Sequence, residues 1–352
     1  MNLVHFIVPA GIDDPARPSG GNAYDRRVAD GLATAGWTVQ VHEVHGSWPR
    51  SDARSLSTLA ALVRGIPDGS LVLLDGLVAS PAAAVLASEA ERLRVVVLVH
   101  MPLGHGTRNR VVRQREETVL SSAASVVTTS AWARLTLLGL YPLHSDRVHV
   151  AEPGVDPAPL AHGTATAGAL LSVAAVIRGK GHDLLLDALA PLTNFQWKCH
   201  CVGSLERDPA FVARLRHRVL EDRIDGRVCF SGPLAGADLA RSYAAADVLI
   251  LPSRAETYGM VIAEALARGL PVLAAEVGGV PEALGHAADG TRPGLLVPPG
   301  DSAALSDAIQ SWLADADLRR RLRVAARERR MSLAGWTTTT SAVADALQAA
   351  AR

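Results

Sequence analysis

The chain has 352 residues, of which 49% are hydrophobic and 20% charged, and its formal net charge is zero. This length exceeds what most single cores reach, so the composition favours a globular protein of two domains with ample core. The balanced charge and an aromatic content of only 4% argue against nucleic acid as the main partner.

The first residues, Met1–Gly11, lack a basic n-region and a small-residue cleavage site, so they predict a buried strand rather than a signal peptide. No apolar run approaches the ~20 residues of a membrane span. Cysteines number three, Cys199, Cys201 and Cys229, and this odd set predicts a reducing, cytoplasmic setting without a disulfide framework. Strand alternation would place His200 opposite Cys199 and Cys201, which favours buried thiols over zinc ligands.

In the first half of the chain, short apolar runs alternate with amphipathic segments. The predicted strands are Leu3–Pro9, Thr38–Val44, Leu71–Leu74, Arg94–His100, Ser125–Thr129 and Val148–Ala151. The predicted helices between them include Ala23–Ala35, Ser55–Arg64 and Ala131–Leu140. This alternation is typical of a parallel, doubly wound sheet built from βαβ units.

The pattern lapses between Pro153 and Gly168 and then restarts, so we predict an interdomain linker there. The later strands are Ala169–Ile177, Phe195–Val202, Val228–Phe230, Val248–Leu251, Val272–Ala275 and Leu295–Val297. The later helices include Asp183–Ala190, Asp208–Leu220, Ala237–Ala245, Val261–Arg268, Ser302–Leu313, Arg319–Arg330 and a last helix with Trp336 near its start. The sequence thus predicts two α/β halves whose strands end at a shared cleft.

Two glutamates, Glu256 and Glu264, flank the start of the apolar helix Val261–Arg268. Glu256 follows the buried strand Val248–Leu251, and Gly259 allows close approach of the backbone to a ligand. The first N–H groups of the helix suit a phosphate. Burying Glu264 among alanines is costly unless hydroxyls or cations meet its carboxylate, as a ribose diol would. Pairing with Arg268 at i,i+4 spacing is the structural alternative.

Two cations, Arg178 and Lys180, stand between glycines after the strand Ala169–Ile177. Cations at a strand's carboxyl end suit a diphosphate, although the spacing is not that of a Walker A motif. Lys180 is one of only two lysines among 35 basic residues. The alternative is an ordinary basic turn.

In the first half, Gly20 and Gly21 open a helix after the first strand, without the GxGxxG spacing of nicotinamide-binding proteins. His100 ends a buried strand at the predicted cleft. It either donates to a sugar hydroxyl or is a hydrogen-bonded core histidine, and the sequence leaves both interpretations open.

Together these motifs resemble the retaining family 4 glycosyltransferases of the GT-B fold, and the resemblance covers nearly the whole chain. It is carried by the Glu256-x7-Glu264 pattern, by the Gly20-Gly21 and Arg178/Lys180 motifs, and by further blocks in family order. These blocks are Glu152-Pro-Gly-Val-Asp156, Phe230-Ser-Gly-Pro-Leu234, Asp247-Val-Leu-Ile-Leu-Pro-Ser253, Gly278-Gly-Val-Pro-Glu282 and Gly294-Leu-Leu-Val-Pro-Pro-Gly-Asp301.

The resemblance implies two Rossmann-like domains facing a central cleft. An acceptor-side domain spans 1–155, with the helix 334–352 packing back on it, and a nucleotide-sugar-binding domain spans 165–333. The implied activity is transfer of a hexosyl group from a UDP- or GDP-linked donor to an acceptor hydroxyl, with retention and without a cofactor.

The resemblance also assigns residue roles. Glu256, Lys180 and His100 would be catalytic, with Glu256 on the donor sugar and Lys180 on the diphosphate. Glu264 would bind the ribose. The remaining donor-binding residues would be Gly20, Gly21, Arg178, Val202, Gly203, Gly232, Leu234, Thr257, Tyr258, Gly259, Met260 and Val261.

In one respect the chain departs from the family pattern. The family often has an arginine five residues before the lysine, where this chain has Ala175, and Arg178 is the candidate replacement. For a metal we predict no site, because Asp315-Ala-Asp317 is expected to face solvent.

Two alternative functions are a sugar-nucleotide epimerase of the same fold and a catalytically silent nucleotide-sugar binder. The acceptor, a small molecule, glycan or glycolipid, is expected at the loops Gly11–Tyr24 and Met101–Arg113. The second loop carries His105, Arg108, Arg110 and Arg113, which suit an anionic acceptor or a membrane headgroup. A solvated basic segment balanced by Glu116 and Glu117 is the structural alternative.

Overall fold

Both halves of the chain form six-stranded parallel sheets, because runs of Val, Leu and Ile are joined by helices long enough to cross over between parallel strands. The computed structural model describes residues 2–14 and 18–352. These residues form two compact units. Unit 1 comprises residues 2–14, 20–154 and 334–352, and unit 2 comprises residues 18–19 and 155–333. Residues 15–17 of the predicted acceptor loop Gly11–Tyr24 lie outside the described residues.

The sheet of unit 1 has the strand order β2-β1-β3-β4-β5-β6, and all its neighbours are parallel. Its strands are β1 (Leu3–Pro9), β2 (Thr38–Val44), β3 (Leu71–Asp75), β4 (Arg94–Val99), β5 (Ser125–Thr128) and β6 (Val148–Val150). The chain reverses its direction of progress between β1 and β3, so this is where a crevice opens at the carboxyl ends of the strands.

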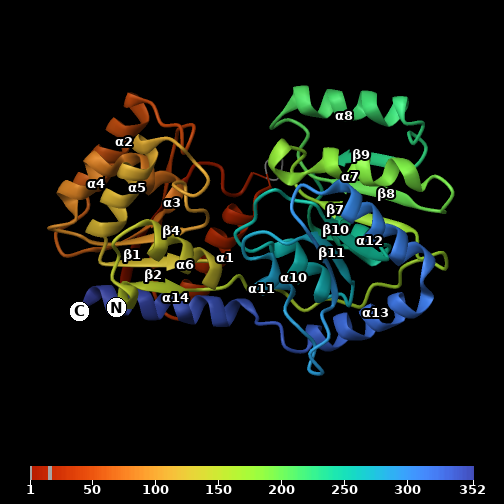
Figure 1. Ribbon diagram of the computed structural model, residues 1–352. Coiled ribbons are helices and arrows are strands. Elements are labelled where there is room, and N and C mark those ends of the chain that lie inside the picture. Colours follow the sequence, from red (N-terminus) through yellow and green to blue (C-terminus); the bar gives the residue numbers. More distant parts are fainter. Residues whose placement is uncertain (1, 15–17) are drawn as a thin grey trace. The chain divides into compact units, whose positions relative to one another are not determined.

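Helices cover both faces of this sheet. They are α1 (Gly20–Thr34), α2 (Ala53–Arg64), α3 (Gly76–Ala79), α4 (Ala83–Glu89), α5 (Arg110–Ser122), α6 (Ala131–Leu140) and α14 (Trp336–Ala351). The helices from α2 through α6 pack on one face of the sheet and share one apolar core with it. Helices α1 and α14 pack on the other face and share a second core. The last helix of the chain therefore completes unit 1 (Figure 1).

The sheet of unit 2 has the strand order β12-β11-β10-β7-β8-β9. Its strands are β7 (Ala169–Val173), β8 (Lys198–Val202), β9 (Val228–Gly232), β10 (Val248–Leu251), β11 (Val272–Ala275) and β12 (Gly294–Val297). Counted within the unit, this order is 6-5-4-1-2-3, the Rossmann arrangement, with its reversal between β7 and β10.

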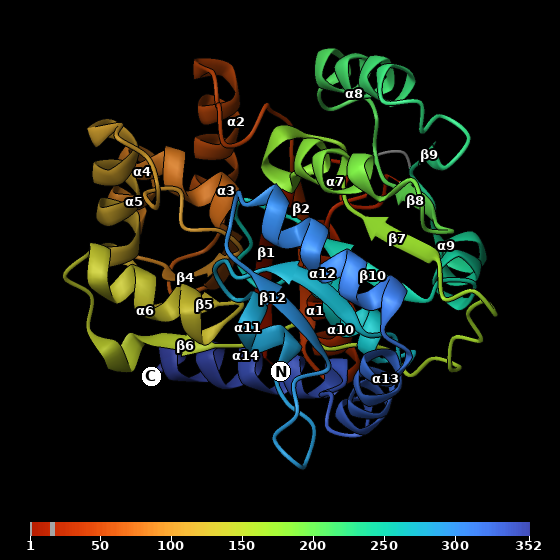
Figure 2. The ribbon, with the colours of Figure 1, turned by 45° about the vertical axis from the view of Figure 1, so that its right-hand side comes forward.

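The helices of unit 2 also form two layers. They are α7 (His182–Leu189), α8 (Pro209–Glu221), α9 (Gly236–Ala244), α10 (Met260–Leu266), α11 (Val280–Leu284), α12 (Ser302–Ala314) and α13 (Ala316–Arg330). A core around Trp312 joins α7, α8 and α12 to one face, where α7 and α12 lie side by side (Figure 2). The other core joins α9, α10 and α11 to the opposite face.

Several predicted boundaries differ from the structure by a few residues, among them the start of β8 at Lys198 rather than Phe195 and the start of α13 at Ala316 rather than Arg319. The first strand of unit 2 ends at Val173 rather than Ile177; beyond it, the backbone N–H of Ala174 donates to Val202 at the end of β8 and that of Val176 to Ser204 in the following loop. Helix α1 begins at Gly20, three residues earlier than predicted. Residues 155–164 belong to unit 2, although we predicted a separate linker there.

None of the helices in the described residues combines the length and the apolar character needed to cross a bilayer. The thiols of Cys199 and Cys201 are buried in the core of unit 2. Asp315 and Asp317 are exposed, and Asp315 caps the start of α13.

Candidate functional site

The reversal of strand order in unit 2 brings two charged loops together. The helix that follows β7 packs on one face of the sheet, and the helix that follows β10 packs on the other. The loops after these neighbouring strands therefore diverge and leave a crevice at their carboxyl ends. Lys180 lies in the first loop and Glu256 in the second.

Lys180 and Glu256, 76 residues apart in sequence, form an ion pair in which Lys180 Nζ lies 2.5 Å from Glu256 Oε1. The hydroxyl of Ser253 donates to the same carboxylate oxygen at 3.1 Å. The lysine side chain is 28% exposed and that of the glutamate 11%, so the pair is partly open to solvent. Two of the three residues predicted to be catalytic are thus in direct contact.

Arg254 fastens the two loops to each other. Its backbone N–H donates to the Gly179 carbonyl, and its guanidinium donates to the Arg178 carbonyl. The same guanidinium forms a bidentate pair with Asp183 at 2.8 and 2.9 Å. Such forked pairs combine strength with directional specificity. The position of Lys180 relative to Glu256 is therefore fixed by contacts that the sequence analysis did not identify.

Two glycines pack closely against the backbone of Glu256 and Thr257. Gly278 has φ +54°, and a Cβ atom there would clash with the carbonyl oxygen of Glu256. A Cβ on Gly279 would clash with the carbonyl of Thr257, and the Gly279 N–H donates to the Glu256 carbonyl at 3.2 Å. Gly278 and Gly279 thus allow their backbone to pack directly against the backbone of the Glu256 loop.

Glu264 lies in the second turn of α10 and is hydrogen-bonded to a tyrosine. The Tyr243 hydroxyl donates to Glu264 Oε2 at 2.7 Å. Arg268 does not form the predicted side-chain pair; it donates to the Glu264 backbone carbonyl, and its guanidinium lies 4.6 Å from the Tyr243 ring centroid. Burial raises the pKa of Glu264, and the Tyr243 hydrogen bond and the Arg268 charge oppose this rise.

The residues predicted to surround the nucleotide base also meet in unit 2. Val202 pairs with Gly232 in the register of β8 and β9, and the Gly203 N–H donates to the Gly232 carbonyl at 2.9 Å. Gly203 has φ +152°, and a Cβ atom there would clash with the Ala174 carbonyl. Leu234 packs against the core of this face.

The segment before α10 makes a tight entry into the helix. Gly259 adopts φ +93° as the N-cap residue, a conformation that favours glycine, and the helix begins at Met260. Tyr258 is 6% exposed, whereas Thr257 and Val261 are half-buried. The helix therefore begins one residue before the predicted start at Val261.

Arg178 occupies a different place from Lys180. Its guanidinium lies 5.9 Å from the ring centroid of Phe211 in α8. No hydrogen bond joins its side chain to Lys180 or Glu256 among the residues that the structure describes. The structure therefore does not bring Arg178 into the pair, and its predicted role in replacing the missing arginine stays a prediction.

In unit 1, His100 is held by two buried carboxylates. Its Nε2 lies 2.7 Å from Asp25 Oδ1 and 3.9 Å from Asp75 Oδ2. Asp25 lies on α1 after the first strand, and Asp75 ends β3, so the cluster stands at the reversal of this sheet. The His100 side chain is 12% exposed, whereas the carboxylates are buried.

The proton distribution in this cluster departs from that of free side chains. Burial by itself would lower the pKa of His100, but the Asp25 carboxylate outweighs it and raises that pKa to about 9. Burial and the Asp25 charge raise the pKa of Asp75 to about 8. At neutral pH these shifts favour the protonated forms of both His100 and Asp75.

Gly21 lies against the same imidazole. A Cβ atom on Gly21 would lie 3.4 Å from His100 Cδ2, and the Tyr24 ring meets the imidazole edge to face at 5.1 Å between centroids. Gly20 is the first residue of α1. Of the residues predicted in unit 1, Gly21 and His100 are thus in contact.

The Asp25–Asp75–His100 cluster has the composition of a metal site, since its three ligand-type atoms lie within 4.8 Å of one another. However, the 2.7 Å separation of His100 Nε2 and Asp25 Oδ1 is that of a hydrogen bond. This hydrogen bond uses the imidazole nitrogen that would otherwise bind a metal. The residues therefore fit a proton-sharing cluster better than a cation site.

The Met101–Arg113 loop is anchored by a buried glutamate. Glu116 is fully buried and accepts hydrogen bonds from the N–H groups of Leu103 and Gly104 and from the Tyr141 hydroxyl. The interpretation of Glu116 as a surface counter-charge is therefore wrong, because its carboxylate is used to hold the loop.

Residues 165–329 match the family described as Glycosyl transferases group 1. A D-inositol 3-phosphate glycosyltransferase of Jonesia denitrificans is 35% identical over 240 residues, which cover 62% of this chain and 55% of that protein. A namesake from Frankia alni is 32% identical over 65% of this chain and 59% of its own length. The chain spans little more than half the length of these curated relatives.

The second half of the chain is thus similar to the group 1 glycosyltransferases. Solved structures are similar in fold to the whole chain. Anabaena HepE in complex with UDP-glucose superposes with a TM-score of 0.80 at 18% identity, covering 99% of this chain and 100% of that one. Sucrose-phosphate synthase of Thermosynechococcus elongatus gives 0.79 at 24% identity, with 98% of both chains covered. The predicted α/β class, two Rossmann-like units of the GT-B fold, is confirmed.

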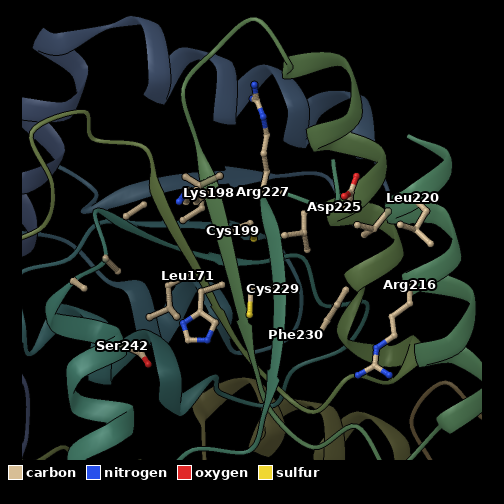
Figure 3. Close-up of a pocket in the computed structure, with 18 residues that line it drawn as sticks. Leu171, Lys198, Cys199, Arg216, Leu220, Asp225, Arg227, Cys229, Phe230 and Ser242 are labelled. Atoms are coloured by element: carbon tan, nitrogen blue, oxygen red, sulfur yellow. The ribbon is translucent and has the colours of Figure 1, made fainter. Parts of the chain in front are cut away.

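A cavity of about 720 Å³ in unit 2 lies away from these charged loops. It is lined by the first residues of β7, β8 and β9 and by α8, with Cys229 and Phe230 on one side and Leu220 on another (Figure 3). Neither Lys180 nor Glu256 nor Glu264 lines it. Because ligands of such sheets bind at the opposite, carboxyl ends, this cavity is not the candidate site.

Sequence reasoning missed the residues that support the site. Asp25, Asp75, Tyr243 and Arg254 each stand in segments whose local pattern is that of an ordinary helix or loop. A signal was available for two of them, since Asp75 ends an apolar strand and Arg254 lies two residues before Glu256. Nothing local distinguishes Asp25 or Tyr243.

Proposed function

We propose that the chain is a retaining glycosyltransferase, which transfers a hexosyl group from a nucleoside-diphosphate sugar to an acceptor hydroxyl. One observation carries the proposal. The Lys180–Glu256 pair stands at the carboxyl ends of β7 and β10, within the segment that matches the group 1 glycosyltransferases.

The two members of the pair suit two parts of such a donor. The Lys180 ammonium offers charge to the diphosphate, on which negative charge grows as the bond to the sugar breaks. The Glu256 carboxylate accepts hydrogen bonds from sugar hydroxyls. In the ligand-free structure each neutralises the other, so the donor would replace this ion pair with contacts of its own.

The acceptor proton has a route that needs no separate base. In a retaining transfer the acceptor oxygen attacks from the face that the diphosphate leaves. Its proton passes to the departing phosphate oxygen, while the bond from the anomeric carbon to that oxygen breaks and a bond to the acceptor oxygen forms. Glu256 and Lys180 then orient the reactants rather than carry the proton.

We propose further that the transfer needs no divalent metal. In the one cluster of metal-ligand composition among the described residues, His100 Nε2 is engaged in a hydrogen bond with Asp25 Oδ1. The chelator EDTA is therefore expected to leave the rate unchanged, and a loss that Mg²⁺ or Mn²⁺ restores would reject metal independence.

The family match and the curated relatives support transfer over the epimerase or the silent binder. The Anabaena relative was solved with UDP-glucose, so UDP-sugars are the first donors to try, followed by GDP- and ADP-sugars. A thermal-shift screen over these compounds would identify the nucleotide.

For the acceptor we propose a phosphorylated polyol. The curated relatives are named for D-inositol 3-phosphate, and Arg108, Arg110 and Arg113 of the Met101–Arg113 loop offer positive charge. Inositol 3-phosphate and unphosphorylated inositol should be compared as acceptors. Equal rates with both would reject recognition of the phosphate.

The stereochemical course provides the decisive experiment. Proton NMR of the first product formed from an α-linked donor should show an α-anomer. A β-anomer would overturn the retaining mechanism, and donor isomerisation without an acceptor would favour the epimerase.

A further inference from the structure

We infer that Tyr243 and Arg268 are positioning residues that hold Glu264 ready for the two ribose hydroxyls of the donor nucleotide. The inference rests on the proposed function, which places the ribose at Glu264. Tyr243 and Arg268 explain how the Glu264 carboxylate, on an apolar helix, stays charged and oriented with one oxygen open to solvent.

Tyr243 is rigidly placed. It is fully buried in the core that joins α9, α10 and α11 to the sheet, so its ring cannot move without disturbing apolar packing. Its hydroxyl donates to Glu264 Oε2 at 2.7 Å. A fixed donor on one oxygen restricts the rotation of the carboxylate around its terminal bond.

Arg268 contacts both Tyr243 and Glu264. Its guanidinium lies 4.6 Å from the Tyr243 ring centroid, and one of its N–H groups donates to the Glu264 carbonyl at 2.8 Å. The cation therefore bridges the ring and the backbone of Glu264. It also supplies positive charge near the carboxylate without occupying either carboxylate oxygen.

The second carboxylate oxygen is left open. Glu264 Oε1 accepts no hydrogen bond from the residues that the structure describes, and it is not among the buried atoms that lack a partner. It therefore faces solvent. A carboxylate offers about four lone-pair sites, so one bond from Tyr243 leaves room for two hydroxyl donors. Adjacent ribose hydroxyls present two such donors at the spacing of one carboxylate.

Charge explains why both supports are needed. Burial raises the pKa of Glu264, and the charge of Asp156 adds to this rise, whereas the Tyr243 hydrogen bond and Arg268 oppose it. A protonated Glu264 would lose acceptor capacity toward the diol. The two residues thus preserve the charged form that binds hydroxyl groups more strongly.

The test compares nucleoside diphosphates that differ only in the ribose, using the base that the screen identifies. In the unmodified protein, the 2′,3′-dideoxy compound should bind about 10- to 100-fold more weakly than the ribonucleotide, as expected for loss of hydrogen bonds to a charged group. In the Tyr243→Phe variant, affinity for the ribonucleotide should fall about tenfold, whereas affinity for the dideoxy compound should stay unchanged.

A matched control exists in unit 1. Tyr141 is also buried, and its hydroxyl also donates to a buried carboxylate, that of Glu116, at 2.6 Å. Tyr141→Phe removes the same kind of hydrogen bond from a residue outside unit 2 and should leave both nucleotide affinities unchanged. Arg268→Met, which keeps most of the side-chain bulk, should reduce the ribose preference a few-fold and provides a second variant if Tyr243→Phe does not fold.

The outcomes separate the two levels of the argument. If no nucleoside diphosphate binds, the proposed function fails, and this inference fails with it. If nucleotides bind and the ribose preference is the same in the unmodified protein and in both variants, Tyr243 and Arg268 do not position Glu264, while the proposed function stands. If affinity for the dideoxy compound falls equally, the substitutions act through the fold and the inference is overturned.

Discussion

The two units place charged residues at corresponding points of their sheets but build the clusters differently. In unit 1, the buried carboxylates of Asp25 and Asp75 lie beside His100, and burial and neighbouring charge together shift the pKa values of Asp75 and His100. In unit 2, the Lys180–Glu256 pair is partly exposed and is held mainly through loop backbone, by Arg254 and Gly278. One cluster is thus a buried proton-sharing group, and the other is a loop-mounted ion pair.

This difference indicates a division of labour. A partly exposed ion pair can exchange partners when an anionic ligand arrives, because both ions already contact water. A buried cluster resists such exchange, since uncovering one charge would be costly. We therefore expect unit 2 to respond to the donor and the unit 1 cluster to keep a fixed charge.

The largest expected effect is the loss of Lys180, which tests the role of the exchangeable pair. Lys180→Ala should lower kcat about 10²- to 10³-fold, the size typical of removing one group that stabilises developing negative charge. Steady-state rates with a saturating donor provide the measurement. Lys198, the other lysine, is exposed at the start of β8, and Lys198→Ala is the matched control with an unchanged rate. Full activity of the Lys180 variant would remove the pair from the mechanism.

The second effect concerns the fixed charge of unit 1. Asp25→Asn keeps the shape of the side chain but removes the negative charge that raises the pKa of His100 to about 9. Burial then lowers that pKa, while the Asp75 carboxylate still raises it, so the imidazole loses its proton at a lower pH than in the unmodified protein and the rates are compared at pH 8. We expect a rate reduction of about 10- to 100-fold there, with the alkaline limb of the pH–rate profile moved to lower pH.

A surface carboxylate of the same unit controls for general effects of charge. Asp13 is largely exposed and pairs with Arg26 on α1. Asp13→Asn should leave the profile in place. If the Asp25 and Asp13 variants share one profile, Asp25 does not set the charge of His100.

The same contrast explains what sequence reasoning could reach. Short loops between strong strand and helix patterns contain Lys180, Glu256 and Gly259, so the local sequence is enough to predict a binding role for these residues. Asp25 and His100 are 75 residues apart and meet only because β1 and β4 lie in one sheet. Strand alternation predicted the class of fold and most elements, but which carboxylate is buried under which imidazole depends on sheet order and packing.

The third effect tests whether the close packing of Gly278 and Gly279 positions Glu256. Gly278→Ala introduces a methyl group that clashes with the Glu256 carbonyl, at φ +54°. We expect the Glu256 loop to shift and the KM for the donor to rise about tenfold, since small displacements of positioning groups are costly. Gly290→Ala is the control, because Gly290 has φ +84° but nothing within 4 Å of its Cβ position. An equal rise of KM in both variants would show that strain at a positive φ causes the effect, and an unchanged KM in Gly278→Ala would show that this glycine does not position Glu256.

The smallest effect at any one pH concerns Asp75 and stability. Its pKa is about 8 in the folded protein and near 3.9 when unfolded, so between these values the folded state binds more protons. Its contribution to stability is present at acid pH and is lost as pH rises through that window.

His100, with a raised pKa of about 9, adds a similar loss only above about pH 6.5. Between pH 5 and 6 His100 therefore contributes almost nothing, whereas the raised pKa of Asp75 gives a slope throughout this range. Asp75→Asn should remove it, so the stability of the variant relative to the unmodified protein should rise with pH, by up to about 1.4 kcal/mol per unit. Urea unfolding at pH 5, 5.5 and 6 measures this difference, and parallel curves would show that Asp75 ionises normally in the folded state.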